Sequence, residues 1–293
     1  MSATRVGLVG PGRLGTLVAH ALGASGATLT RVAGGSDASR TRLRSGLAGV
    51  RDVPLEGVAE GVDLVVIATP DGAVADVVDR LVRADALDAS HGVVHLAGVH
   101  GTAPLRRAGL AGARIAALHP ATTVPAGSHD PAQLHGVAWA VTAAPSDRAW
   151  AHAIVADLGG DPFDVPEDAR VRYHAALALA SNAVGAAVVA ARRTLLASGV
   201  TAPDRLLAPI ARASVDAAAA GGAAALTGPV VRGDTATVAA HLAALGEDLP
   251  EVAEAYRALS RAILTTVRPA LPGDVATALD VLLADPTSAG SDR

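Results

Sequence analysis

A strand-like apolar run followed at once by closely spaced glycines constrains this chain more than any other feature. Residues 6–9 are apolar, a Gly-x-Gly-x-x-Gly spacing follows, and residues 16–22 are helix-like. Between a strand and a helix, such glycines allow a tight turn, let a pyrophosphate approach the backbone, and let the helix pack closely. The pattern predicts a dinucleotide site, with a glycine-rich structural turn as the alternative. The residues assigned to this loop are Gly10, Gly12, Arg13, Leu14 and Gly15.

Strand-like and helix-like runs alternate along the first 165 residues. Alternation of this kind predicts an α/β fold with a doubly wound, mostly parallel sheet. The further expected strands are 27–33, 62–68, 92–97, 114–118, 137–142 and 162–165. Ligands of such sheets lie outside the carboxyl ends of the strands. Residues predicted at these ends beside the cofactor or substrate are Thr69, Pro70, Gly98 and His119.

Beyond residue 166 the strand-like runs stop and only helix-like runs remain. The expected helices are 170–198, 203–219, 235–245, 250–268 and 273–284. With 293 residues, the chain is long enough for two domains that each bury a core. We therefore predict a Rossmann domain over residues 1–164 and an all-helical substrate and dimerisation domain over residues 165–293.

The end of the second expected strand indicates which nicotinamide cofactor is bound. An acidic residue at this position favours NAD, whereas an arginine accommodates the 2′-phosphate of NADP. The strand is followed by Gly-Gly-Ser, ending at Ser36, and then by Arg40 and Arg42. Asp37 argues for NAD unless it caps a helix. We predict NADP, held by Ser36 and Arg40, with NAD as the less favoured alternative.

Two histidines are candidates for acid–base chemistry. His119 follows a predicted strand, where it can donate a proton to a substrate oxygen or nitrogen. The alternative is a histidine hydrogen-bonded within the loop before Pro120. His174 and Ser181 are seven residues apart, so on a regular α-helix they project within about 20° of each other, with Asn182 about 80° from His174. This strip either orients a substrate or forms an interhelical hydrogen-bond cluster.

Arg232 and Asp234 follow a Gly-Pro turn near the expected helix at 235–245. Arg232 can bind a substrate carboxylate through two parallel hydrogen bonds. Alternatively, it pairs with Asp234 or a neighbouring helix. Asp234 itself is placed to cap the helix that follows.

Composition excludes several kinds of chemistry. All 24 cationic side chains are arginines and the chain has no cysteine, so a lysine proton donor, a thiolate nucleophile and cysteine-ligated metals are ruled out. His91, His95 and His100 lack helical spacing and a neighbouring carboxylate, so no metal site is predicted. The net charge of −4 and the scattered arginines argue against nucleic acid. We expect no membrane span, a cytoplasmic location and a small-molecule substrate.

Three stretches resemble a known group of proteins. They are Leu-His-Pro at 118–120, Tyr-His-Ala at 173–175 with Ala-Ser-Asn at 180–182, and Leu-Thr-Gly-Pro-Val-Val-Arg-Gly-Asp at 226–234. Together they resemble a two-domain Rossmann-like oxidoreductase family whose C-terminal helical domain has no assigned function. This family belongs to the 6-phosphogluconate dehydrogenase C-terminal-like superfamily, and some relatives are described as ketopantoate reductases. The resemblance covers nearly the whole chain.

The resemblance implies an NAD(P)-dependent oxidoreductase acting on a small carbonyl or imine metabolite, such as the 2-oxo acid ketopantoate. A prephenate-dehydrogenase-like or imine-reductase-like enzyme is the alternative, as is a protein that binds NADP(H) without turnover. Better-known relatives use a lysine proton donor on the long helix, which this chain lacks. Prephenate dehydrogenases have a His-Pro at the strand end that corresponds to His119. The resemblance thus names His119, His174, Ser181, Asn182 and Arg232 as catalytic candidates.

The helical part has few large side chains for five helices. Gly185 lies within the long helix, and Val184, Val188 and Leu195 lie on more than one of its sides. A helix that is apolar around most of its circumference is normally buried around most of it. We therefore predict a two-fold homodimer formed through the helical domain.

Overall fold

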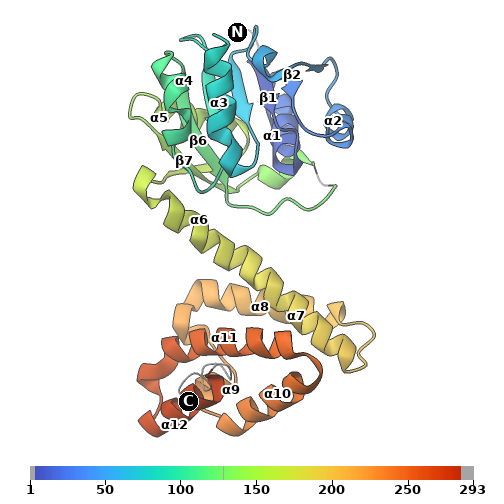
Figure 1. The fold of residues 1–293 in the computed structure, drawn as a ribbon, viewed down its shortest axis with the longest axis vertical. Coiled ribbons are helices and arrows are strands. Elements are labelled where there is room, and N and C mark those ends of the chain that lie inside the picture. The colour runs from blue at the N-terminus through green and yellow to red at the C-terminus, as the bar shows by residue number, and fades with distance from the viewer. Residues whose placement is uncertain (1–3, 128, 285–293) are drawn as a thin grey trace, which may run out of the picture. The chain divides into compact units, whose positions relative to one another are not determined.

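The computed structural model describes residues 4–127 and 129–284. Its contacts divide the chain into two compact units, Met1–Ala180 and Ser181–Arg293, called here the Rossmann unit and the helical unit (Figure 1). The predicted fold class is confirmed. The division by contacts falls after Ala180, because Arg170 and Tyr173 of the long helix bind two strands of the sheet. The domain bounds 1–164 and 165–293 stay a prediction.

The Rossmann unit is built on an eight-stranded sheet of order β3-β2-β1-β4-β5-β6-β7-β8. All neighbouring strands are parallel except β6 and β7, as a mostly parallel sheet predicts. The strand β3 has only two polar residues and therefore gives no apolar signal in the sequence. The strands are β1 (Arg5–Val9), β2 (Thr28–Ala33), β3 (Arg51–Asp52), β4 (Leu64–Ile67), β5 (Gly92–His95), β6 (Arg114–Pro120), β7 (Ala138–Ala143) and β8 (Asp161–Asp164).

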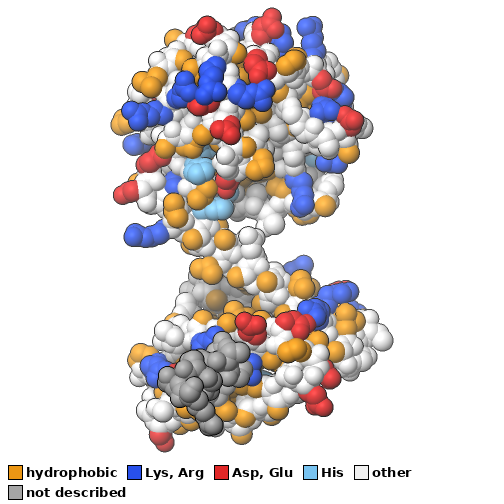
Figure 2. All heavy atoms as spheres, in the orientation of Figure 1, with side chains coloured by type: hydrophobic (Ala, Val, Ile, Leu, Met, Phe, Trp, Pro, Cys, Tyr) orange, Lys and Arg blue, Asp and Glu red, His pale blue; other side chains and the backbone are white. Residues whose placement is uncertain are grey.

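Helices cover both faces of this sheet because successive side chains of its central strands point to opposite sides. Leu64 and Val66 of β4 join the core that packs on α1 (Arg13–Ala24), α2 (Asp37–Arg44) and α5 (Arg148–Asp157). Val65 and Ile67 join the core that packs on α3 (Val74–Arg83) and α4 (Arg106–Leu110). On the face shown in Figure 2, arginine and acidic side chains of this unit are interspersed and do not form one basic stripe.

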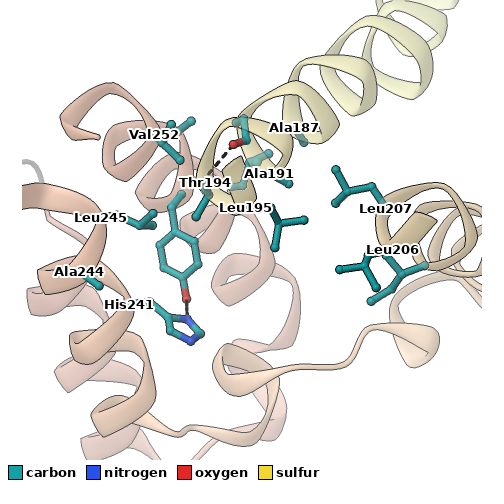
Figure 3. Close-up of a pocket in the computed structure, with 15 residues that line it drawn as sticks. Ala187, Ala191, Thr194, Leu195, Leu206, Leu207, His241, Ala244, Leu245 and Val252 are labelled. Carbon is teal, nitrogen blue, oxygen red and sulfur yellow. Dashed lines mark hydrogen bonds between the residues drawn. The ribbon is translucent and has the colours of Figure 1, made fainter. Parts of the chain in front are cut away.

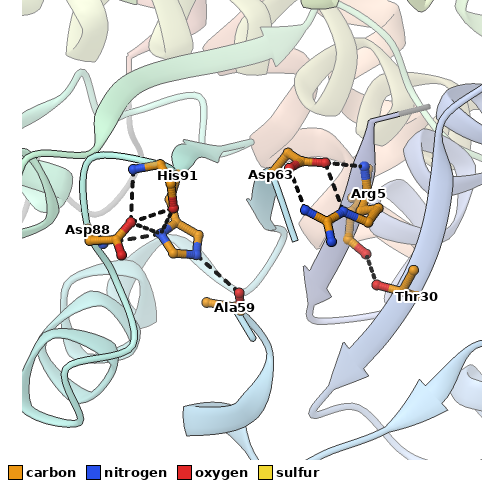
Figure 4. A network of polar contacts seen from close by, with 8 residues as sticks. Arg5, Thr30, Ala59, Asp63, Asp88 and His91 are labelled. Atoms are coloured by element: carbon orange, nitrogen blue, oxygen red, sulfur yellow. Dashed lines mark hydrogen bonds and ion pairs between the residues drawn. The ribbon is translucent and has the colours of Figure 1, made fainter. Parts of the chain in front are cut away.

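Polar contacts tie together the amino ends of the central strands (Figure 4). The backbone N–H and guanidinium of Arg5 donate to the carboxylate of Asp63, at 2.8 and 2.9 Å. His91 Nδ1 lies 2.8 Å from Asp88 Oδ1, and its Nε2 lies 3.1 Å from the carbonyl oxygen of Ala59. His91 thus serves to hold the segment before β5 in place, at the edge opposite to the glycine loop.

The long helix predicted at 170–198 is continuous but not regular. It consists of α6 (Arg170–Ala178), a π-turn at Leu179–Ala183 and α7 (Val184–Ala197). A π-turn contains more residues per turn than an α-helix. The predicted angle of about 20° between His174 and Ser181 assumed a regular α-helix, so it does not describe this helix.

By length and composition, the run Glu167–Ala197 could cross a membrane, with mean hydropathy 1.6. This corrects the expectation that no run reaches such a length, because the helix continues through Gly185. Composition is weak evidence here, since core helices pass the same test. The first turns of this run are held against β6 and β7 by Arg170 and Tyr173.

The helical unit has a small core made by its last four helices. The buried side chains are Val230, Val238, Leu242, Leu264, Leu279 and Leu283. Neither α7 nor α8 contributes a buried residue. The remaining helices are α8 (Asp204–Gly221), α9 (Pro229–Arg232), α10 (Thr235–Asp248), α11 (Pro250–Val267) and α12 (Gly273–Leu283).

Candidate functional site

The glycine loop has the geometry that its spacing predicts. Gly10 has φ +89° and donates its N–H to the carbonyl oxygen of Ala33 at 3.0 Å. Gly12 is the residue before α1, and a Cβ placed on it would meet nothing within 4 Å. A Cβ on Gly15 would lie 2.3 Å from the carbonyl oxygen of Gly10. Gly10 and Gly15 are therefore required by the fold, whereas Gly12 leaves backbone space that suits a pyrophosphate at the start of α1.

Thr69 lies directly beside this loop. Its backbone nitrogen is 3.1 Å from the position a Cβ would take on Gly10. The hydroxyl of Thr69 is buried and has no hydrogen-bond partner within residues 4–127 and 129–284. Pro70 follows it and begins the turn before α3. The fold thus brings the loops after β1 and β4 together, as predicted for a cofactor site.

Ser36 and Arg40 lie at the start of α2, beyond β2. Ser36 rather than Asp37 caps the helix, accepting a hydrogen bond from the N–H of Ser39 at 3.3 Å. Asp37 occupies the first turn instead and is 96% exposed at its side chain. Arg40 donates to the carbonyl oxygens of Gly34 and Gly35, at 3.1 and 2.7 Å, and pairs with the carboxylate of Asp37.

These contacts bear on the choice of cofactor. A Cβ on Gly35 would lie 2.6 Å from the ring of Pro11, so the start of α2 packs against the glycine loop. The guanidinium of Arg40 is therefore near the predicted ribose position, and 26% of the side chain is exposed. The Asp37 carboxylate already pairs with the Arg40 guanidinium and would compete with a 2′-phosphate for it. Arg40 therefore suits a 2′-phosphate by position and charge, whereas Asp37 does not.

A cluster of rings forms at the carboxyl end of β6. The Nδ1 atom of His119 is hydrogen-bonded to the hydroxyl of Tyr173 at 3.0 Å. His174 packs edge-on against His119, with the ring centres 5.7 Å apart. Gly98 makes the approach possible, because a Cβ there would lie 2.5 Å from His174 and 2.8 Å from His119. The structure therefore places Gly98 against the two histidines that were predicted as acid–base candidates.

Burial is the main cause of the protonation state of His119. Together with the nearby His174, Arg170 and His95, burial lowers the pKa of His119 to about 4. At neutral pH the imidazole is therefore uncharged, and one of its nitrogens pairs with the Tyr173 hydroxyl. Burial also raises the pKa of Tyr173, while the charge of Arg170 opposes that effect.

His95 lies beneath this cluster and is fully buried. Its Nε2 lies 2.7 Å from the carbonyl oxygen of Gly101, and its Nδ1 accepts the N–H of Ala97 at 3.1 Å. Both ring nitrogens are thus used in hydrogen bonds to the loop after β5. The role of His95 is to shape that loop.

Three residues that the sequence analysis did not single out complete the site. Tyr173 pairs with His119, Arg170 lies beneath the pair, and Glu167 binds the loop after β5. The Glu167 carboxylate accepts the N–H groups of Thr102 and Ala103, at 2.7 and 3.1 Å. An arginine at the start of a helix normally faces solvent, so the sequence does not indicate that Arg170 is buried. The one available signal was that Arg170 follows closely after the last expected strand.

The remaining predicted residues lie in the helical unit. Ser181 donates its hydroxyl to Asn182 Oδ1 at 3.2 Å, and both belong to the π-turn. Asp234 caps α10 as predicted, accepting the N–H of Thr237 at 3.0 Å, and Arg232 ends α9. That Ser181, Asn182 and Arg232 lie beside His119 stays a prediction.

The helical unit also contains an apolar groove of 690 Å³ between α7, α8, α10 and α11 (Figure 3). Leu195, Leu206 and Ile210 line it, and the hydrogen bond between His241 and Tyr256, 3.0 Å long, is among its few polar features. Leu206 and Ile210 are 55% and 64% exposed. No such groove was predicted from the sequence, which indicated only that the long helix is apolar on more than one side.

Two family models match the chain. Residues 1–120 match a Rossmann-like domain, and residues 137–263 match a domain of unknown function (DUF2520). No curated protein matches the chain.

Solved structures share the fold at low sequence identity. A candidate NADP oxidoreductase from Bacteroides fragilis is 22% identical, with a TM-score of 0.75 over 89% of this chain and 98% of that protein. A reductive aminase from Aspergillus terreus, in complex with NADPH and ethyl-5-oxohexanoate, is 17% identical, with a TM-score of 0.67 over 96% and 99%. An imine reductase from Myxococcus stipitatus, in complex with NADP+, is 19% identical, with a TM-score of 0.62 over 96% and 100%.

Proposed function

Because the chain combines a Rossmann-like domain with a C-terminal domain of unknown function, we propose that it is an NADP-dependent oxidoreductase. One observation carries the proposal: a glycine loop shaped for a pyrophosphate and a histidine–tyrosine pair lie at the same edge of the sheet. Gly10, Thr69 and His119 follow or end β1, β4 and β6, which run parallel through β5. A cofactor bound along that edge would reach the ring cluster.

The residues for the cofactor are those of the loops after β1, β2 and β4. Gly12 and the N–H groups at the start of α1 would hold the pyrophosphate, and Ser36 and Arg40 the 2′-phosphate. NADPH supplies a hydride when bound. The proteins of similar fold that contain NADPH or NADP+ support the choice of NADP over NAD.

The neutral state of His119 changes how the proton is assigned. An imidazole with a pKa of about 4 carries no extra proton to donate at neutral pH. His119 is better suited to orient the Tyr173 hydroxyl, to which it is hydrogen-bonded at 3.0 Å. We propose His174 as the proton donor on geometric grounds, because its ring packs against His119 and both rings border the position of a Cβ on Gly98.

For the substrate, we propose a small carbonyl or imine metabolite. When hydride adds to the carbon of either bond, the oxygen or nitrogen must gain a proton. The ring cluster can supply that proton. The fold shared with a reductive aminase and an imine reductase favours an imine over ketopantoate. Ser181 and Asn182 are proposed to position the acceptor, and Arg232 to bind a substrate carboxylate.

The groove of the helical unit supports the predicted homodimer. The apolar faces of α7 and α8 have no buried residue, and exposed Leu206 and Ile210 lie on the groove. Exposed apolar patches of this kind commonly mark protein interfaces. We propose that a second copy covers this groove.

The test of activity is NADPH oxidation with a panel of 2-oxo acids, cyclic imines and ketone–amine mixtures at several pH values. Wild-type protein should turn over at least one class, and His174→Ala should lower kcat by roughly 100-fold or more. Gly12→Val serves as a binding-deficient control, because a Cβ on Gly12 meets nothing within 4 Å and the side chain would extend into the space proposed for the pyrophosphate. Tight NADPH binding without turnover of any class would instead identify a protein that only binds the nucleotide.

A further inference from the structure

The guanidinium of Arg170 is buried in the Rossmann unit, and no carboxylate within residues 4–127 and 129–284 accepts a hydrogen bond from it. The residue is 1% exposed. Its Nε donates to Thr142 Oγ1 at 2.7 Å, and one Nη donates to the carbonyl oxygens of Ala117 and Ala140, at 2.9 and 3.1 Å. The other Nη is buried and has no hydrogen-bond partner in the described part of the chain. Burial of a charge with only neutral acceptors is costly, so its retention calls for an explanation.

The acceptors of Arg170 lie on the strand pair that carries His119. Ala117 belongs to β6, and Ala140 of β7 is the residue paired with His119. Arg170 is the first residue of α6, three residues before Tyr173. Its guanidinium carbon lies 5.9 Å from the ring centre of Tyr173. One side chain therefore links both strands to the helical turn that carries Tyr173 and His174.

We propose that Arg170 is a positioning residue for the His119–Tyr173 pair: by binding carbonyl oxygens of both strands, it fixes the first turn of α6 over the strand that carries His119. This role deepens the proposed function and, as far as turnover is concerned, rests on it. Loss of the anchor would let Tyr173 and His174 shift relative to His119, and misplacement of about 1 Å can cost roughly 100-fold in rate.

The charge of Arg170 acts on the same pair. The ionisable groups around His119 are His95 of β5 and Arg170, Tyr173 and His174 of α6. After burial itself, His174, Arg170 and His95 all disfavour a proton on His119. Removal of the guanidinium should therefore raise the pKa of His119, whereas a residue that only fills space would leave it unchanged.

The experiment is an NMR titration of the His119 ring in the full-length protein, with the resonance assigned by its loss in His119→Ala. Arg170→Gln and Arg170→Met should raise the pKa of His119 by roughly one unit. Arg170→Lys keeps the charge and should leave the titration near that of wild type. Arg31→Met is the matched control, because Arg31 is 17% exposed and binds Gly57 and Glu60 away from the site.

Turnover separates anchoring from charge. Arg170→Lys should still lower kcat by roughly tenfold or more, since an ammonium group lacks the planar fork that binds Thr142 and both strands. An unshifted His119 titration in folded Arg170→Gln, or wild-type kcat in Arg170→Lys, would overturn the proposal. If Arg170→Met does not fold, the His119 titration in Arg170→Gln and the kcat of Arg170→Lys still test the proposal. Absence of turnover in wild type would count against the proposed function, while the titration would still test Arg170.

Discussion

The Rossmann unit and the helical unit use their apolar side chains differently. The sheet of the Rossmann unit is covered on both faces, and its central strands are buried from end to end. Among its described residues, the helical unit buries seven valine and leucine side chains, all in α9–α12, while α7 and α8 bury none. The first unit has what it needs to fold alone, whereas the second leaves part of its apolar surface for something else to cover.

The same contrast holds for polar groups. Buried polar side chains of the Rossmann unit include His95, Thr142 and Arg170, all hydrogen-bonded within that unit. In the helical unit, Ser260 is the buried polar residue among the described residues. The Rossmann unit thus satisfies these buried polar side chains internally, whereas α7 and α8 of the helical unit leave apolar side chains exposed.

The largest effect is expected where the helical unit is incomplete. Leu206→Glu with Ile210→Glu places two carboxylates on the apolar groove, and burying unpaired charges there would cost several kcal/mol. The double variant should be monomeric in sedimentation velocity at micromolar concentration, where wild type is expected as a dimer. Leu110→Glu on α4 is the control, since this exposed leucine, 78% accessible, belongs to the Rossmann unit and is not among the residues that line the groove. If wild type is monomeric and active, the helical unit does not need a second copy to cover its apolar groove, and the contrast between the two units fails.

The second effect concerns the pH dependence of stability that the buried polar side chains of the Rossmann unit should produce. Burial lowers the pKa of His95 to about 4, below its ordinary 6.5. As the pH falls, His95 takes up a proton near pH 6.5 in the unfolded chain but only near pH 4 in the folded protein. The stabilisation is therefore fully present above pH 6.5 and is lost as the pH drops from 6.5 towards 4. Between pH 6.5 and pH 4, the titration of His95 should lower the free energy of unfolding by roughly 3 kcal/mol. Denaturant unfolding at several pH values should show a flatter pH dependence in His95→Gln than in wild type.

The smallest effect concerns cofactor choice within the Rossmann unit. Arg40→Ala should weaken NADPH binding relative to NADH by roughly tenfold to 100-fold, which is about 1.5–3 kcal/mol for an arginine–phosphate contact. Fluorescence titration with both nucleotides measures the ratio. Arg83→Ala on α3 removes an exposed arginine elsewhere and should leave it unchanged. An unaltered ratio in Arg40→Ala would show that Asp37 keeps the guanidinium from the phosphate.

Much of the Rossmann unit could be predicted because its signals are local. The Gly10–Gly12–Gly15 spacing and the apolar runs each depend on a few neighbouring residues, and the structure has the corresponding turn and strands. Capping of α2 was considered for Asp37 only as the alternative to a role in binding NAD, and Ser36 is the cap; serine and aspartate are both good caps, so the sequence alone does not decide between adjacent ones. The strand β3 went unnoticed because it is two polar residues long.

The site was harder to predict because its contacts join distant segments. His119 and Tyr173 are 54 positions apart, and Arg170 reaches Ala117 over 53. No periodicity records such contacts, so Tyr173 and Arg170 were missed while their neighbour His174 was noticed for its chemistry. The π-turn was likewise invisible, because Leu-Ala-Ser-Asn-Ala reads as ordinary helix.

The Glu167 carboxylate has a consequence for how the site moves. Glu167 begins the 3₁₀ turn Glu167–Ala169 that leads directly into α6, and its carboxylate accepts the N–H groups of Thr102 and Ala103 and, at Oε2, the Thr102 hydroxyl. Local opening of that loop would break several charge-assisted hydrogen bonds at once. Loop and helix should therefore open as one cooperative segment, and the amide protons of Thr102 and Ala103 should exchange with solvent at the rate set by the first turn of α6.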